Sequence, residues 1–109
     1  MGQHRGRRKP KQLAAKLLAI RVKLEVSQGQ LARLLGFDKG GARISEFERG
    51  IREPDLMTLL KFSELAHVSL TVLADDRLEL KFPKGWKKPR RVSRLQTLNL
   101  DGNAEARTT

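Results

Sequence analysis

The amino-acid sequence predicts an all-α fold of five short helices with a basic extension at each end. Apolar residues recur at intervals of three and four along much of residues 11–75, which is the period of an amphipathic helix. Ser or Asp stands directly before three of these runs, and Gly follows two of them, as expected at helix starts and ends. The length of 109 residues favours a single domain.

The first helix is predicted over residues 11–24. Its apolar positions step by 4, 3 and 4 residues and therefore share one face: Leu13, Leu17, Ile20 and Leu24. The other face carries Lys16, Lys23 and Glu25.

A second helix is predicted over residues 28–35. Ser27 and Gln30 match the S-x-x-Q pattern of a capping box, in which each side chain bonds the backbone N–H of the other residue. Gly36 stands directly after the helix, at the position where a left-handed backbone commonly ends it.

A turn at residues 37–41 leads to a third helix, predicted over residues 42–49 and ended by Gly50. Asp38 is its candidate N-cap. Ile44 and Phe47 share the inner face. Three charged side chains point outward: Arg43, Glu46 and Arg49.

Asp55 and Ser69 are the predicted N-caps of the last two helices. The apolar positions of the fourth helix are Leu56, Leu59, Leu60 and Leu65. The fifth covers about residues 70–75, with Leu70 and Leu73 buried. After it, charged and apolar residues alternate over residues 77–82, which is compatible with a short strand.

The net charge of +11 is concentrated at the two ends of the chain. Residues 1–9 have four Arg or Lys and no acid, and residues 77–109 have nine against three, whereas residues 10–76 have ten against nine. Such flanks act as solvated arms that bind phosphate without reading sequence, or serve only solubility. The charge predicts an anionic partner, nucleic acid before membrane.

The sequence also restricts chemistry and compartment. The absence of Cys excludes disulfides and thiolate metal sites and fits a reducing cytosol. We expect a cytoplasmic protein, because neither a signal-peptide core nor an apolar run of membrane-spanning length is present. No pattern indicates an enzyme, a cofactor or a metal: His4 and His67 are far apart, and Ser27 is better explained as a cap than as a nucleophile.

Two short helices joined by a tight, Gly-containing turn form a helix-turn-helix pattern when the second is polar on its outer side. Here the chain resembles the lambda-repressor/Cro-type helix-turn-helix family, also called the xenobiotic-response-element family. The resemblance covers about residues 13–75 and rests on pieces in the family's order: SQGQLARLLG, ISEFERG and REPDLMTLLKFSELAHVSLTVL. It implies a five-helix, lambda-repressor-like DNA-binding domain over residues 11–76.

The resemblance implies roles for individual residues. The third helix resembles a recognition helix, so four positions become candidates for base contacts: Lys39, Ala42, Arg43 and Glu46. Candidates for phosphate contacts are Gln28, Arg49 and Arg52. Arg21 and Glu48 resemble a structural pair between the first helix and the end of the third.

The N-terminal arm, residues 1–10, adds three phosphate-contact candidates: Arg5, Arg7 and Arg8. Arg5-Gly6-Arg7 also resembles the core of an AT-hook, which lies in the minor groove, but nonspecific phosphate binding is the preferred interpretation. We expect this arm to be disordered when free.

Two features depart from the family pattern. Seven residues, FDKGGAR, separate Gly36 from Ile44, which is more than the family's common spacing. Either the turn is longer or the third helix starts a turn early. His67 occupies a helix C-terminal position where the family usually has Gly; His tolerates a left-handed backbone better than most residues.

We therefore predict a sequence-specific double-stranded DNA-binding protein that regulates transcription, a repressor rather than an activator. A homodimer is expected, because one recognition helix covers few base pairs. Its predicted surface consists of Leu70, Leu73, Phe82 and Trp86; alternatively, Phe82 and Trp86 fold back on their own domain.

An alternative function is that of an antitoxin, which uses the same fold to bind a protein partner and its own promoter. The basic C-terminal extension, residues 77–109, is expected to be partly disordered and would bind that partner. A small apolar patch is the candidate contact: Leu95, Leu98 and Leu100.

Overall fold

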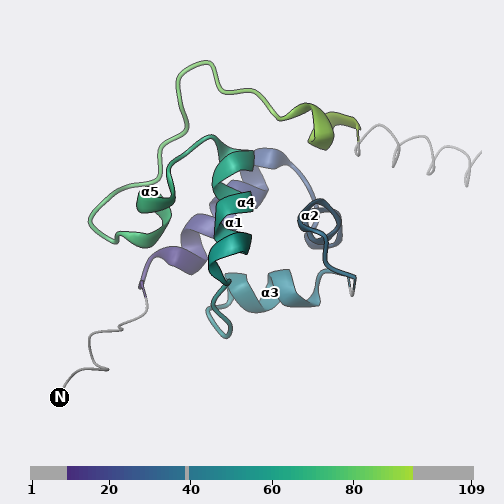
Figure 1. Ribbon diagram of the computed structural model, residues 1–109, viewed down its shortest axis with the longest axis horizontal. Coiled ribbons are helices and arrows are strands. Elements are labelled where there is room, and N and C mark those ends of the chain that lie inside the picture. The colour runs from purple at the N-terminus through teal and green to yellow at the C-terminus, as the bar shows by residue number, and fades with distance from the viewer. Residues whose placement is uncertain (1–9, 39, 95–109) are drawn as a thin grey trace, which may run out of the picture.

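The computed structural model describes residues 10–38 and 40–94, and its regular structure over them is helical (Figure 1). The helices are, in chain order, α1 (Leu13–Leu24), α2 (Gln28–Leu35), α3 (Ala42–Glu48), α4 (Leu56–Ala66) and α5 (Leu70–Ala74). The predicted all-α class is confirmed. Residues 77–82 form no strand, because no second strand among the described residues lies beside them to complete a ladder.

Side-chain caps fix the start of three helices. The predicted capping box is present: Ser27 Oγ accepts from the N–H of Gln30 at 3.0 Å, and Gln30 Oε1 accepts from the N–H of Ser27 at 2.9 Å. The predicted Asp and Ser caps of α4 and α5 are present as well. The predicted cap of α3 is wrong, because Asp38 lies in the preceding turn and the N-cap is Gly41, which has no side chain to bond.

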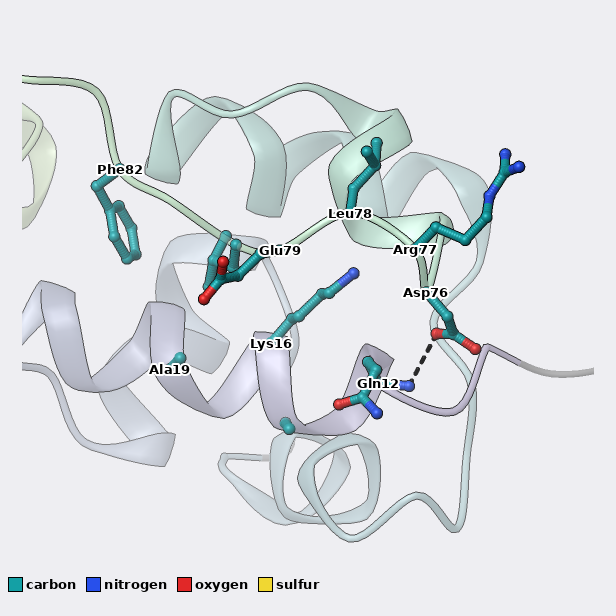
Figure 2. A pocket seen from close by; sticks show the side chains of 10 residues that line it. Gln12, Lys16, Ala19, Asp76, Arg77, Leu78, Glu79 and Phe82 are labelled. Carbon is teal, nitrogen blue, oxygen red and sulfur yellow. Dashed lines mark hydrogen bonds between the residues drawn. The ribbon is translucent and has the colours of Figure 1, made fainter.

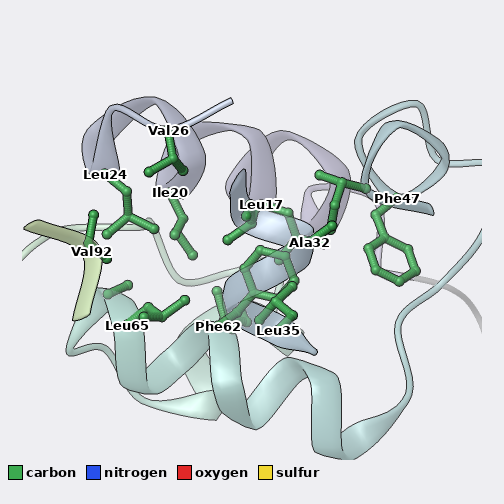
Figure 3. Close-up of a cluster of buried hydrophobic side chains, with 14 of the residues drawn as sticks. Leu17, Ile20, Leu24, Val26, Ala32, Leu35, Phe47, Phe62, Leu65 and Val92 are labelled. Atoms are coloured by element: carbon green, nitrogen blue, oxygen red, sulfur yellow. The ribbon is translucent and has the colours of Figure 1, made fainter. Parts of the chain in front are cut away.

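The core is formed by apolar side chains from all five helices (Figure 3). The predicted inner face of α1 is confirmed, since all four of its apolar positions are at most 5% exposed. On α4 the prediction was partly wrong: Leu56 is 64% and Leu60 38% exposed, while Phe62 is fully buried. The buried face of α4 follows Thr58, Phe62 and Leu65, which are spaced by four and three residues.

Lys16, which the helical periodicity placed on the outer face of α1, is only 6% exposed. Its Nζ donates to the carbonyl oxygens of Val72 at 2.6 Å and Asp75 at 3.0 Å. These carbonyls lie at the end of α5, where a cation is favoured by the helix dipole and by unpaired C=O groups. Periodicity within α1 could not reveal this bond, because its acceptors come from the other end of the domain.

Asp76 joins the end of the helical domain to the start of α1 (Figure 2). Its two carboxylate oxygens accept from the N–H groups of Lys11 at 2.8 Å and Gln12 at 2.9 Å. Since the N-cap of α1, Gln12, makes no side-chain cap bond of its own, Asp76 supplies one. These bonds lower the pKa of Asp76, that from Gln12 most. A groove of about 430 Å³ lies between this junction and Phe82.

Residues 77–94, which we call the strap, follow α5 and run along α1 from its start towards its end (Figures 1 and 2). Val92 is fully buried and belongs to the core cluster (Figure 3). Phe82 and Trp86 pack against that cluster with ring centroids 5.4 Å apart. Lys23 Nζ lies 5.3 Å from the first ring centroid and 5.4 Å from the second. The folded unit therefore continues past residue 76.

The strap corrects the predicted dimer surface. Leu73 is fully buried within its own domain, and Leu70 is half-buried. Phe82 and Trp86 fold back on α1, as the alternative interpretation held. The patch of the antitoxin hypothesis, at positions 95, 98 and 100, lies outside the described residues.

Candidate nucleic-acid interface

Helices α2 and α3 meet at very short range through the turn between them. Gly36 ends α2 with a φ of 85°. A Cβ on Gly41 would lie 2.8 Å from the Cβ of Gln28 and 2.9 Å from the backbone N of Gly29, so glycine is needed there for space. The longer turn thus brings the start of α3 against the start of α2, and α3 begins at Ala42 rather than a turn earlier.

Helix α3 buries one face and exposes the other. Ile44 and Phe47 are buried, as predicted. Ala42 and Arg43 are exposed near its start, and Glu46 is half-buried one turn later. The outer face therefore offers a methyl group, a guanidinium and a carboxylate within two helical turns.

Arg43 is positioned by an aromatic pair. Its guanidinium carbon lies 5.0 Å from the ring centroid of Phe37. Phe37 in turn meets the buried Phe47 edge-on, with centroids 6.1 Å apart. Cation–π contact over a ring that is itself packed restricts the side chain of Arg43 while leaving it exposed.

The other two arginines of this surface are bonded to side chains of α3. Arg52 Nε donates to Glu46 Oε1 at 2.8 Å, and these side chains are 53% and 34% exposed. Arg49 Nε donates to Ser45 Oγ at 3.2 Å. Because exposed ion pairs contribute little to stability, the bond between Arg52 and Glu46 can be exchanged for bonds to a ligand.

Glu48, the last residue of α3, connects this helix to α1 and α2. Its side chain is 6% exposed and accepts from Arg21 Nε at 2.6 Å and Nη2 at 3.1 Å. Gln28 Nε2 also donates to Glu48, at 3.0 Å. Arg21 donates further to the carbonyl of Val26 at 3.1 Å. The amide of Gln28 is thus occupied within the protein.

The first turn of α2 offers main-chain donors on the same surface. The capping box uses the N–H groups of Ser27 and Gln30. Those of Gln28 and Gly29 have no acceptor among residues 10–38 and 40–94. They lie at the positive end of the helix dipole, where an anion is favoured.

Asp55 places a negative charge near this surface. Hydrogen bonds from the side chain and then the backbone N–H of Thr58 lower its pKa, with smaller contributions from Lys61 and Arg43. Asp55 is therefore ionised at neutral pH and balances part of the charge of Arg43.

The structure brings together five of the predicted contact residues, on α3 and directly after it: Ala42, Arg43, Glu46, Arg49 and Arg52. Lys39, Arg5, Arg7 and Arg8 lie outside the described residues. Phe37 and Gly41 are not among the site residues that the sequence predicted. An apolar residue directly after a helix-ending Gly is a usable signal for Phe37, but no local pattern separates Gly41 from Gly40.

Within the part of the chain that the structure describes, no three His, Cys, Asp or Glu side chains gather in a way that could hold a metal ion. The helices found there are too short or too polar to cross a membrane.

The helix-turn-helix family matches residues 17–73, just over half of the chain. The match runs from α1 to α5 and includes α2, the turn and α3. No curated protein and no solved structure gives a significant match. The family consists of DNA-binding domains rather than enzymes. The chain therefore belongs to the lambda-repressor/Cro-type helix-turn-helix family.

Proposed function

We propose that this protein binds double-stranded DNA sequence-specifically through α3 and acts as a repressor of transcription. The observation that carries the proposal is Arg43, which is exposed on α3 and held over Phe37. A restrained side chain loses less conformational freedom on binding than a free one. In the major groove, an Arg bonds both O6 and N7 of guanine.

The other base contacts extend from the same helix. The carboxylate of Glu46 suits the N4 amino group of cytosine, and the methyl of Ala42 suits the thymine methyl. Lys39, which precedes α3 in the sequence, is proposed as a fourth base contact. When Glu46 turns to a base, Arg52 is released toward a phosphate.

Phosphate contacts position the protein on the duplex. We assign them to the main-chain N–H groups at Gln28, to Arg49 and to Arg52. The N-terminal arm adds Arg5, Arg7 and Arg8. The side-chain amide of Gln28 stays on Glu48 in this arrangement, so the anchor at the start of α2 is its backbone.

A symmetric dimer is part of the proposal. The segment from the end of α3 into α4 exposes three apolar side chains: Ile51 at 59%, Leu56 at 64% and Met57 at 61%. A two-fold contact through this patch would bring two α3 helices to one side of the assembly, because the patch follows α3 directly. Half-sites would then lie about 34–36 Å apart.

Repression is proposed rather than activation, because a protein that occupies an operator blocks transcription without contacting a second protein. A cytoplasmic location, expected from the sequence, fits a DNA partner and is part of the proposal.

The test is the affinity of full-length Arg43→Ala for a duplex selected from random DNA and for its single-base variants, measured by fluorescence anisotropy. We expect the variant to lose about 1–3 kcal/mol of binding free energy on the selected duplex. At one position it should bind equally well whichever base is present. The control is Arg77→Ala, which removes the same charge from a side chain that is 88% exposed and bonded to Asp75. It should change neither the affinity nor the base preference. A loss for Arg43→Ala that is equal at every sequence would exclude Arg43 as a reading residue.

A further inference from the structure

The strap carries a row of positive charges. Residues 80–94 contain no acid and seven basic residues: Lys81, Lys84, Lys87, Lys88, Arg90, Arg91 and Arg94. Lys88 Nζ is bonded to Glu25 Oε1 at 2.6 Å, and Lys81 Nζ lies 3.9 Å from Glu79 Oε1. The other five are exposed and form no ion pair with any acid in residues 10–38 or 40–94.

These cations are presented by a segment that is fixed to the domain. Val92 is fully buried in the core, and Phe82 and Trp86 pack against it. The bond between Lys88 and Glu25 adds a polar attachment at the end of α1. The strap is therefore a surface of defined shape, unlike the solvated arm that its composition predicted.

The strap and α3 lie on opposite sides of α1. Ala14 and Arg21 face α3: a Cβ on Gly50 would lie 4.0 Å from that of Ala14, and Arg21 bonds Glu48. Lys23 follows two residues after Arg21, about 200° further around the helix, and lies beneath the strap's aromatic rings. Figure 1 shows α3 at the bottom of the view and the strap across the top. A straight duplex in contact with α3 therefore does not reach the strap.

The chemistry of the strap favours a phosphate backbone as its ligand. Stable protein partners are bound through buried aromatic and apolar anchors, and single-stranded nucleic acid through stacking on exposed aromatic rings. Both aromatic side chains of the strap, Phe82 and Trp86, are turned toward α1 and Lys23. What faces outward is mainly charge, which suffices for binding a duplex without reading its sequence.

We propose that the strap binds the phosphate backbone of a second DNA duplex while α3 occupies the first, so that one protein molecule joins two duplex segments. The proposal rests on the proposed function for the first duplex only.

The test is a capture assay with the full-length protein. Beads carry the duplex that the protein selects, and a fluorescent duplex of random sequence is added. Wild-type protein should retain the fluorescent duplex. The fourfold variant Lys84→Ser, Lys87→Ser, Arg90→Ser, Arg91→Ser should lower its capture at least about tenfold and reduce the slope of log affinity against log salt by about 3–4. Its affinity for the selected duplex should stay within about threefold.

A matched control removes four exposed charges that lie outside both α3 and residues 80–94: Lys11→Ser, Arg33→Ser, Lys61→Ser and Arg77→Ser. Compared at equal occupancy of the bead-bound duplex, it should capture the second duplex as wild type does. The fluorescence of Trp86, the single Trp of the chain, reports whether the strap stays docked in each variant.

Equal capture by the strap variant and wild type, or no capture by wild type, would overturn the proposal. The proposal would also be overturned if poly-glutamate displaced the fluorescent duplex as effectively as unlabelled duplex does at equal charge. Acidic proteins would then fit the strap equally well. If the proposed function were wrong, a selection from random DNA would enrich no sequence. This outcome differs from failure of the strap proposal, which the capture assay measures. Capture between two random duplexes, with and without the strap substitutions, would then decide the role of the strap.

Discussion

The two basic surfaces of this protein, on α3 and on the strap, lie on opposite sides of α1 and are built differently. On and beside α3, each described arginine has a neighbour: Arg43 lies over Phe37, Arg49 bonds Ser45 and Arg52 bonds Glu46. On the strap, the cations extend from irregular chain and from a helical turn at residues 90–94, and the segment is held by side chains pointing inward. Charges with defined directions can discriminate among bases, whereas charges without partners offer attraction to any polyanion.

The largest effect is expected from the buried carboxylate of Glu48 at the end of α3. Glu48→Ala leaves Arg21 without a carboxylate partner and should lower the free energy of unfolding by about 1.5–3 kcal/mol, the range for hydrogen bonds to charged groups. Glu46→Ala breaks an exposed pair and should cost at most about 1 kcal/mol. Thermal unfolding without DNA measures both; equal midpoints for the two variants would show that burial of Glu48 has no energetic consequence.

The positions of Gly40 and Gly41, just before α3, favour glycine for two different reasons. Gly41→Ala places a Cβ against the backbone of α2 and should cost about 1–3 kcal/mol, as overpacking does. Gly40→Ala meets open space and should cost about 1–2 kcal/mol through its φ of 66° alone. Binding to the selected duplex should fall for Gly41→Ala at temperatures where both variants are folded. An unchanged affinity would mean that the contact of α2 with α3 does not position the reading helix.

Attachment of the strap can be measured independently of DNA. Val92→Ala removes two buried methyl groups and should cost about 1–2 kcal/mol, with a red shift of Trp86 emission as the strap loosens. Arg94→Ala, at an exposed position of the same segment, should change neither quantity. If the two variants unfold at the same urea concentration, the strap is not part of the folded unit.

The smallest effect is a dependence on pH at the junction of α5 and α1. The pKa of Asp76 is lowered below its ordinary value of 3.8 by the N–H groups of Gln12 and Lys11. Stabilisation by Asp76 is therefore fully present above that value and is lost as the pH falls through the lowered pKa. Asp76→Asn should be less stable than wild type at pH 6, and the difference should shrink as the pH falls below 3.8. A difference that stays constant as the pH falls would contradict the capping role of Asp76.

Most of the helical core could be predicted from the sequence, because its signals are local. The S-x-x-Q pattern at Ser27, the Gly that ends α2 and the spacing of apolar residues in α1 depend on neighbours within one or two turns. The left-handed backbone at His67, with a φ of 57°, follows from its place at the end of α4.

The rest depends on contacts between distant parts of the chain. Lys16 donates to carbonyl oxygens more than 50 residues away in the sequence, and the start of α1 is capped by Asp76. Val92 carries no local sign that it enters the core, since it stands between two Arg residues and Ser93. Among the site residues, the sequence located α3 but not Phe37 beneath Arg43, which acts through space and not through helical spacing.

Whether α3 reads base sequence can be measured by selecting bound duplexes from random DNA with the full-length protein at physiological salt. We expect an enriched motif made of two inverted half-sites with centres about 10 base pairs apart. The motif should lose information at one symmetric position when the selection is repeated with Arg43→Ala. A bound pool as random as the starting pool, recovered while the protein still binds DNA, would contradict sequence reading by α3.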